Sequence, residues 1–153
     1  MSSKIKAIFV LVFFFLLFLY FKSVHNLEVL QPSSNSAGST FEYVDSKRER
    51  VDSHYNKMDL YTWSEDFVKE DLLRLCKMEK KKFKSGMFYH LVVFNNSSQA
   101  VFPENPFTAM FGLQYEVMKH IKAYYVFNRI NGFSKLRIYE DNMFESLPEI
   151  VEI

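Results

Sequence analysis

The sequence predicts an α/β protein built from an N-terminal transmembrane helix, a flexible stem and a small domain. An unbroken apolar run lies between lysines near the start, and a polar stretch without hydrophobic period follows it. Strand-like and helix-like patterns then alternate to the end of the chain. We therefore divide the chain into a cytoplasmic tail and signal-anchor helix (1–22), a stem (23–56) and a luminal domain (57–153) with a βαβ unit and an additional amphipathic helix.

The first element is the stretch "KIKAIFVLVFFFLLFLYFK", which is apolar from Ala7 to Phe21. As a helix it would span roughly 25 Å, which suits a thin early-secretory membrane of about 27 Å. Lys4 and Lys6 precede the run, and the positive-inside rule keeps that end in the cytoplasm. The sequence therefore predicts a type II membrane protein that contacts membrane lipid through this N-terminal helix.

A cleaved signal peptide is the alternative for the same residues, because it shares the charged start and the apolar core. The cleavage site is poor, since "FKSVHN" places His or bulky residues at the critical positions. The small residues of "SNSAGS" lie too far beyond the apolar run. If cleavage does occur, the chain is a secreted binding protein.

The stem is predicted from composition. "QPSSNSAGST" and "DSKRERVDS" are rich in Ser, Asn, Gly, Pro and charge, and neither has a hydrophobic period. Such a segment holds a domain away from the bilayer, and "DSKRER" is interpreted as a solvated run of charge.

An amphipathic helix is predicted in "TWSEDFVKEDLLRLCKMEKKK". Thr62 and Glu65 have the spacing of a capping box, and lysines crowd the end as the helix dipole favours. Trp63 and Phe67 lie beside the apolar stripe near its start. The stripe itself should pack on the core, with the cysteine as a small buried thiol; its members are Val68, Leu72, Leu75 and Cys76.

A strand buried on both faces is predicted for "GMFYHLVVF" (86–94), because it is apolar almost throughout. It is followed by two overlapping glycosylation sequons, Asn95-Asn96-Ser97 and Asn96-Ser97-Ser98. Crowding allows one glycan at a time, on Asn95 or on Asn96.

A long helix is predicted from Pro106 to Ile130, with Asn105 as N-cap and Asn131-Gly132 as C-cap. Its apolar residues form two neighbouring stripes, so we expect burial on more than one side. "FSKLRIY" (133–139) then alternates as a strand. The 86–94 strand, this helix and the 133–139 strand would form the βαβ unit.

Most catalytic and cofactor motifs are missing. The net charge of +1 predicts no nucleic-acid partner. No Gly-rich phosphate loop or nucleophile elbow occurs, so no catalytic residue, metal or cofactor is predicted. Glu140 and Asp141 follow a strand where α/β proteins place ligand groups, and they are weak ligand candidates. The histidines lie far apart without metal-ligand spacing, and His90 is interpreted as a packed or surface residue; they are His25, His54, His90 and His120.

The block from Phe107 to Ile138 resembles the fukutin family, which consists of Golgi type II proteins of dystroglycan O-mannosyl glycan assembly. The shared features are "FTA", "LQY", a lysine, "GF" and the strand "LRI". In this chain the positions before the strand are Phe107, Thr108, Ala109, Leu113, Gln114, Tyr115, Lys119, Gly132 and Phe133.

The resemblance covers about thirty-five residues and implies the luminal region between the anchor and the transferase domain of that family. The metal-binding aspartates of the family's nucleotidyltransferase-like domain have no counterpart here, so no catalytic residue is carried over. The sequence thus predicts an ER or Golgi membrane protein that supports protein O-glycosylation, with a Golgi glycosyltransferase or a glycoprotein substrate as partner. Transferase activity is expected only if the chain continues beyond residue 153. The alternative is an anchored or secreted interaction module unrelated to glycans.

Overall fold

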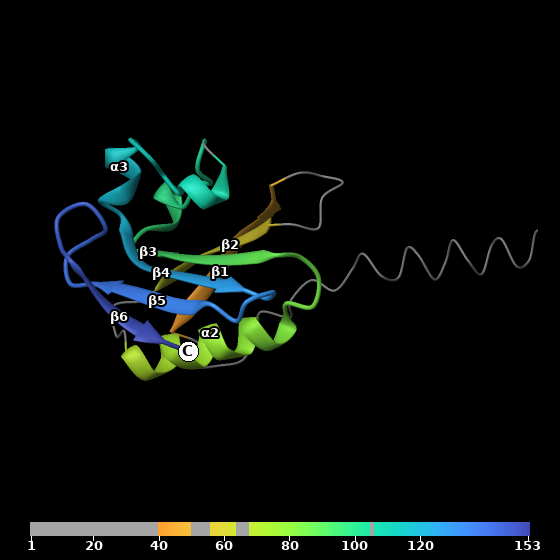
Figure 1. Ribbon diagram of the computed structural model, residues 1–153. Helices are drawn as coiled ribbons and strands as arrows, with labels where there is room; N and C mark the ends of the chain where they lie inside the picture. The colour runs from red at the N-terminus through yellow and green to blue at the C-terminus, as the bar shows by residue number, and fades with distance from the viewer. Residues whose placement is uncertain (1–39, 50–55, 64–67, 105) are drawn as a thin grey trace, which may run out of the picture. The chain divides into compact units, whose positions relative to one another are not determined.

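A single six-stranded sheet organises the protein, with its strands in the order β1-β2-β3-β4-β5-β6 (Figure 1). The computed structural model describes residues 40–49, 56–63, 68–104 and 106–153. Neighbouring strands are antiparallel except β2 and β3, which are parallel. The strands are β1 (Phe41–Arg48), β2 (Asn56–Trp63), β3 (Phe88–Phe94), β4 (Ile121–Asn128), β5 (Ser134–Tyr139) and β6 (Pro148–Glu152).

Helix α2 (Lys69–Lys82) connects the two parallel strands and covers one face of the sheet (Figure 1). Acidic residues lie in its first turn and lysines in its last, as the dipole favours. Leu72, Leu75 and Cys76 are buried beneath it, which confirms most of the predicted stripe and the buried thiol. Burial raises the pKa of the Cys76 thiol, and the nearby Glu79 carboxylate raises it further.

The helix begins later than the sequence indicated. Thr62, the expected capping residue, is buried in β2, and Trp63 ends that strand. Val68 is the N-cap, is 48% exposed and makes no side-chain capping bond. The predicted capping box is therefore wrong, because Thr62 and Trp63 belong to the strand β2 and not to the first turn of a helix. Glu65 and Phe67 lie outside the described residues.

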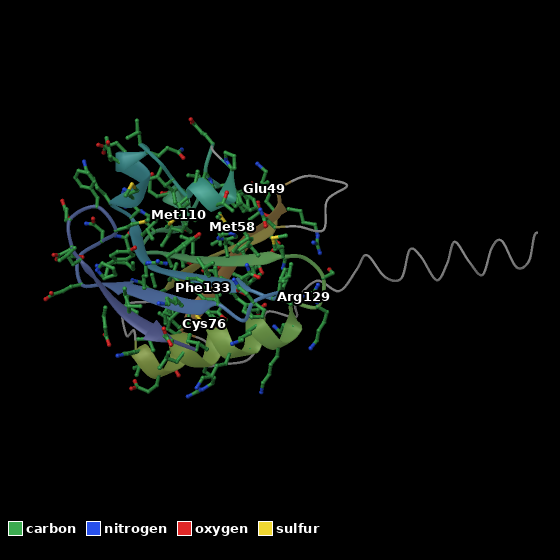
Figure 2. All side chains as sticks on the ribbon, in the orientation of Figure 1. Glu49, Met58, Cys76, Met110, Arg129 and Phe133 are labelled. Atoms are coloured by element: carbon green, nitrogen blue, oxygen red, sulfur yellow. The ribbon has the colours of Figure 1, made fainter. Side chains whose placement is uncertain are left out.

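The segment between β3 and β4, here called the lobe (95–104 and 106–120), covers the opposite face of the sheet (Figure 1). It contains only short helices: the 3₁₀ turns η1 (Ser97–Gln99) and η2 (Phe107–Ala109) and one turn of α-helix, α3 (Tyr115–Met118). Phe107 and Phe111 pack from the lobe onto Met58, Leu60 and their neighbours. Figure 2 shows Met58 and Met110 on the lobe side of the sheet and Cys76 on the α2 side.

The predicted helix 106–130 is wrong, because residues 121–128 form the central strand β4. β4 is buried along almost its whole length, on the α2 face through Ala123, Tyr125 and Phe127 and on the lobe face through Tyr124 and Val126. A strand buried on both faces loses its alternation, so its apolar residues also fall at helical spacings. The β-branched and aromatic content of "AYYVF" was the signal for a strand.

The predicted βαβ unit is consequently wrong, because its strands and helix are not the ones that the sequence indicated. The parallel pair is β2 and β3, connected by α2, whereas β5 is antiparallel to β4. The strands predicted at 86–94 and 133–139 are confirmed as β3 and β5. Asn131 and Gly132 lie in the tight connection between β4 and β5 instead of capping a helix, and Gly132 has φ +75° there. That positive φ is the conformation that glycine adopts without strain.

The ordered sheet also begins earlier than the domain start expected at residue 57. β1 lies within the range assigned to the stem, and it adds an edge strand through its pairing with β2. No helix among the described residues has the length and hydropathy to cross a membrane. The expected signal-anchor, residues 1–22, lies outside the described part of the chain.

The two faces of β3 can be tested separately, because Leu91 faces α2 and Val92 faces the lobe, both fully buried. We expect Leu91→Ala to lower the free energy of unfolding by about 2–5 kcal/mol, and Val92→Ala to lower it by about 1–3 kcal/mol because a smaller side chain is removed. Urea unfolding of the purified chain followed by circular dichroism measures both. Ile130→Ala, at a residue 69% exposed, is the control and should change little; an equally small effect of Val92→Ala would contradict burial on both faces.

Candidate functional site

A line of polar side chains crosses the apolar layer between the sheet and the lobe. His90 of β3 and Tyr124 of β4 are 2% and 1% exposed, and the His90 Nδ1 atom and the Tyr124 hydroxyl lie 2.5 Å apart in a hydrogen bond. The His90 ring also packs near the rings of Phe88 and Phe107, at centroid distances of 6.0 Å each. The sequence left His90 as either a packed or a surface residue, and the structure shows it packed. Its bond to a buried tyrosine was not foreseen.

Two atoms of this layer have no hydrogen-bond partner within the described residues, His90 Nε2 and Asn56 Oδ1. Asn56 lies on β2 opposite Phe88, two residues before His90 on the neighbouring strand. The amide nitrogen of Asn56 donates to Glu49, whose other oxygen accepts from the Phe107 backbone at 2.9 Å. A buried polar atom without a partner costs about 1–3 kcal/mol, so ordered water is expected between sheet and lobe here.

Glu49 ties the end of β1 to the lobe, and Figure 2 shows it at that end of the sheet. Burial lowers the pKa of His90 to about 4, and the Glu49 carboxylate opposes that shift only in part. His90 is therefore neutral at neutral pH. Burial raises the pKa of Tyr124, and the Arg137 guanidinium moderates the shift. The buried centre of the line is thus uncharged, with Glu49 and Arg137 as the charged groups nearest to it.

Arg137 lies on β5 opposite Tyr124 of β4 and Ile150 of β6. It is half-buried and makes no hydrogen bond or ion pair with any described residue. Tyr139, two residues along the same strand, has a pKa that burial raises and Arg137 lowers in part. Sequence reasoning missed these two residues. The alternation in "KLRIY" was the available signal, because it places Lys135, Arg137 and Tyr139 on one face.

A second polar cluster lies on the α2 face and is fully bonded. Asp59 is 1% exposed and accepts from Ser46 at 2.5 Å, from Lys57 at 2.8 Å and from Tyr89 at 2.8 Å. Glu79 of α2 pairs with Lys82 at 2.7 Å. Burial and the charge of Asp59 raise the pKa of Tyr89, so its hydroxyl stays a donor. Because each buried carboxylate here has partners, we interpret this cluster as a support that connects β1, β2 and β3.

The weak ligand candidates Glu140 and Asp141 are exposed just after β5. Their backbone carbonyls accept from the Lys122 ammonium, which also lies 5.4 Å from the centroid of the Trp63 ring. The structure therefore gives their main chain a role in holding the end of β5. It does not bring their carboxylates together with the His90 line, and ligand binding by them stays a prediction.

Both sequon asparagines are exposed in the turn after β3. Asn95 Oδ1 bonds to His120 Nδ1 at 3.1 Å, and Asn96 Oδ1 accepts from the Ser98 backbone and hydroxyl at 2.9 Å each. In each case the oxygen is the bonded atom, which leaves the amide nitrogen, the atom that carries a glycan, pointing elsewhere. Their glycosylation stays a prediction.

The residues of the fukutin-like block are divided between the lobe and the β4–β5 turn. Phe107 is buried, whereas Thr108, Ala109, Gly132 and Phe133 are exposed. Gln114 holds the lobe by accepting from the Glu104 backbone at 3.1 Å. The remaining members, Leu113, Tyr115 and Lys119, gather at α3.

These three residues form, with Phe144 of the β5–β6 loop, an exposed surface that we call the α3 patch. Leu113, Tyr115 and Phe144 are 78%, 46% and 48% exposed. The Tyr115 and Phe144 rings are 5.3 Å apart, and the Lys119 ammonium lies 5.8 Å from the Phe144 centroid. Large exposed aromatic side chains that contact one another are typical of interaction surfaces.

No group of His, Cys, Asp or Glu side chains in the described part of the chain has an arrangement that could hold a metal ion. No protein-family model matches the chain, and no curated protein or solved structure is significantly similar to it.

The buried His90 predicts an acid-sensitive fold. Its pKa of about 4 in the folded chain lies below the ordinary 6.5 of the unfolded chain, so the unfolded state takes up the proton first. The contribution of neutral His90 to the free energy of unfolding is therefore fully present above pH 6.5. It is lost as the pH decreases towards 4, and the loss amounts to about 3 kcal/mol. His90→Gln should remove this part of the pH dependence in urea unfolding measured between pH 4 and 8.

His120→Gln is the matched control, since His120 lies in the lobe but is not buried. It removes a histidine without opening the buried layer, so it separates the loss of a histidine from the loss of the buried His90. If the free energy of unfolding changed equally with pH in the unaltered chain and in His90→Gln, His90 would not be buried in its neutral form.

Proposed function

We propose that this chain is a single-pass type II membrane protein of the ER or Golgi whose luminal domain supports protein O-glycosylation without the catalytic step. In this proposal residues 1–22 anchor the chain in the bilayer, and the domain contacts a membrane-bound glycosylation enzyme through the α3 patch.

The membrane part of the proposal is supported by the sequence. The apolar run from Ala7 to Phe21 has lysines on both sides, and the charge before it favours a cytoplasmic N-terminus. The remainder of the chain would then face the lumen. The overlapping sequons at Asn95 and Asn96 are exposed, so they are accessible to luminal oligosaccharide transfer if the orientation is as proposed.

The observation that carries the binding role is the composition of the α3 patch. Of the block that resembles the fukutin family, the exposed Leu113 and Tyr115 and the half-buried Lys119 lie together on α3 and the residues that flank it. Phe144 reaches this group from the β5–β6 loop. Two aromatic rings and a lysine on the surface supply the contact area and the polar rim that a protein partner requires.

A binding role also agrees with the polar chemistry of the α2 face. The buried carboxylates Asp59 and Glu79 are occupied by hydroxyl and ammonium partners. Carboxylates that are hydrogen-bonded in this way stabilise the packing of the strands and the helix against one another. The proposal accordingly assigns the described domain to recognition, with group transfer left to the partner.

The test uses the full-length chain, tagged at its C-terminus and expressed in cells. We expect it to stay in the membrane pellet after carbonate extraction and to resist protease in intact vesicles. We expect Tyr115→Ala with Phe144→Ala to reduce co-purification of the glycosylation enzyme about tenfold, because interface aromatics contribute more than 1 kcal/mol each. Mass spectrometry of cross-linked complexes measures the loss.

Met78→Ala is the control, because Met78 is 44% exposed on α2 and matches Tyr115 in exposure but lies outside the patch. Extraction by carbonate, or digestion in intact vesicles, would refute the membrane arrangement. Patch-dependent partners that have no role in glycan assembly would favour the alternative, an interaction module unrelated to glycosylation. Equal complex formation by the patch variant and the control would refute the binding role of the patch.

A further inference from the structure

The lobe covers only part of its face of the sheet. The cluster beneath it draws its residues from β2, β3 and β4, with Tyr139 as its member from β5 and none from β6. The same face of β5 and β6 therefore lies beside the lobe, where Arg137 stands opposite the 54% exposed Ile150. Arg137 occupies this open strip at the margin of the lobe.

Arg137 differs from the other half-buried cations of the described residues. Each of those makes an ion pair or donates to a backbone carbonyl, and they are Lys57, Lys69, Lys80, Lys119, Lys122 and Lys135. Arg137 does neither. A guanidinium that is partly removed from water without an acceptor forfeits hydration and gains no hydrogen bond in return.

A second donor lies beside it. Tyr139 shares the face of Arg137 through its spacing of two along β5, and its hydroxyl has no hydrogen-bond partner among the described residues. The two groups influence each other electrostatically, as Arg137 lowers the pKa of Tyr139 against the effect of burial. By contrast, the hydroxyl of Tyr124 is bonded to His90.

The charges nearby favour an anion. Lys135, two residues before Arg137, lies on the same face and pairs at 3.3 Å with Glu152, which is strongly exposed. Glu149 of β6 pairs with Lys69 of α2 and so belongs to the opposite face. The strip thus contains two cations and one carboxylate, and the carboxylate is already paired with Lys135.

We propose that Arg137 and Tyr139 form a binding site for an oxyanion, the carboxylate or phosphate group of a small ligand. The planar guanidinium presents parallel N–H donors that match two oxygens of either group. The Tyr139 hydroxyl supplies a further donor, and Ile150, opposite Arg137 on β6, forms an apolar flank. This inference does not rest on the α3 patch or on the proposed membrane role.

The experiment titrates the purified full-length chain in detergent with acetate and, separately, with inorganic phosphate, at constant ionic strength set by chloride. Nuclear magnetic resonance of ¹⁵N-labelled chain follows the amides of β5 and β6. We expect saturable shifts around Arg137 and Tyr139 for at least one probe. The probe that binds more tightly identifies the group as a carboxylate or a phosphate.

Variants then assign the donors. Arg137→Gln should weaken binding about 10- to 100-fold, as loss of a charge-assisted pair of hydrogen bonds requires. Arg137→Lys should recover only part of the affinity, because an ammonium group lacks the two parallel N–H donors of a guanidinium. Tyr139→Phe should weaken binding about 2- to 10-fold. Lys77→Gln, at an exposed lysine of α2, removes the same charge and should leave the affinity within twofold.

Urea unfolding separates this site from a structural role. If Arg137 serves a ligand, Arg137→Gln should leave the midpoint unchanged or raise it, since a half-buried unpaired cation is removed. A lower midpoint for Arg137→Gln would assign Arg137 to the support of the fold and overturn the proposal. So would the absence of saturable shifts with both probes, or equal weakening by Arg137→Gln and Lys77→Gln. Tyr115→Ala should leave binding intact, so a failure of the α3 patch is distinguishable.

Discussion

The burial of β3 on both of its faces is the constraint from which the architecture follows. Leu91 and Val93 face α2, whereas Val92 and Phe94 face the lobe, and all four are fully buried. A sheet with such a strand at its centre must be covered on both sides. Helix α2 covers one side as part of the connection between the parallel strands, and the lobe covers the other as the connection from β3 to β4.

Helix α2 and the lobe cover the sheet in different ways, and this difference determines which face carries the proposed binding surfaces. α2 is a regular helix whose buried face closes over a fully bonded polar cluster around Asp59. The lobe is a chain of short turns that stops at the margin of β5, and one polar atom each of Asn56 and His90 beneath it has no partner among the described residues. The lobe carries exposed apolar side chains at α3, and Arg137 beside the lobe is only half-buried. Both proposed surfaces are thus on the lobe side of the sheet.

Sequence reasoning succeeded where a pattern had a single interpretation. The run "FYHLVVF" is too short and too rich in β-branched residues for a helix, and the stripe of Leu72, Leu75 and Cys76 fits only a helix on a core. It failed where burial removed the alternation, as in Ile121–Asn128, whose apolar residues also satisfy a helical spacing. β1 was missed because its outward residues are charged, as is usual for an edge strand. Those outward residues made it look like part of the polar stem.

The candidate site was less predictable, because its distinguishing feature is a missing partner and not a motif. The alternation in "KLRIY" places Arg137 and Tyr139 on one face, but only the pairing of β5 with β4 and β6 shows that no carboxylate stands opposite them. The hydroxyl of Tyr124, which lies opposite Arg137 on β4, bonds to His90 and makes no hydrogen bond to the guanidinium. Neutral His90 also keeps positive charge out of the layer beneath the lobe, so the unpaired charge at the open strip is that of Arg137, because Lys135 is paired with Glu152. A ligand that binds at that strip would therefore supply the negative charge that no described carboxylate provides to Arg137.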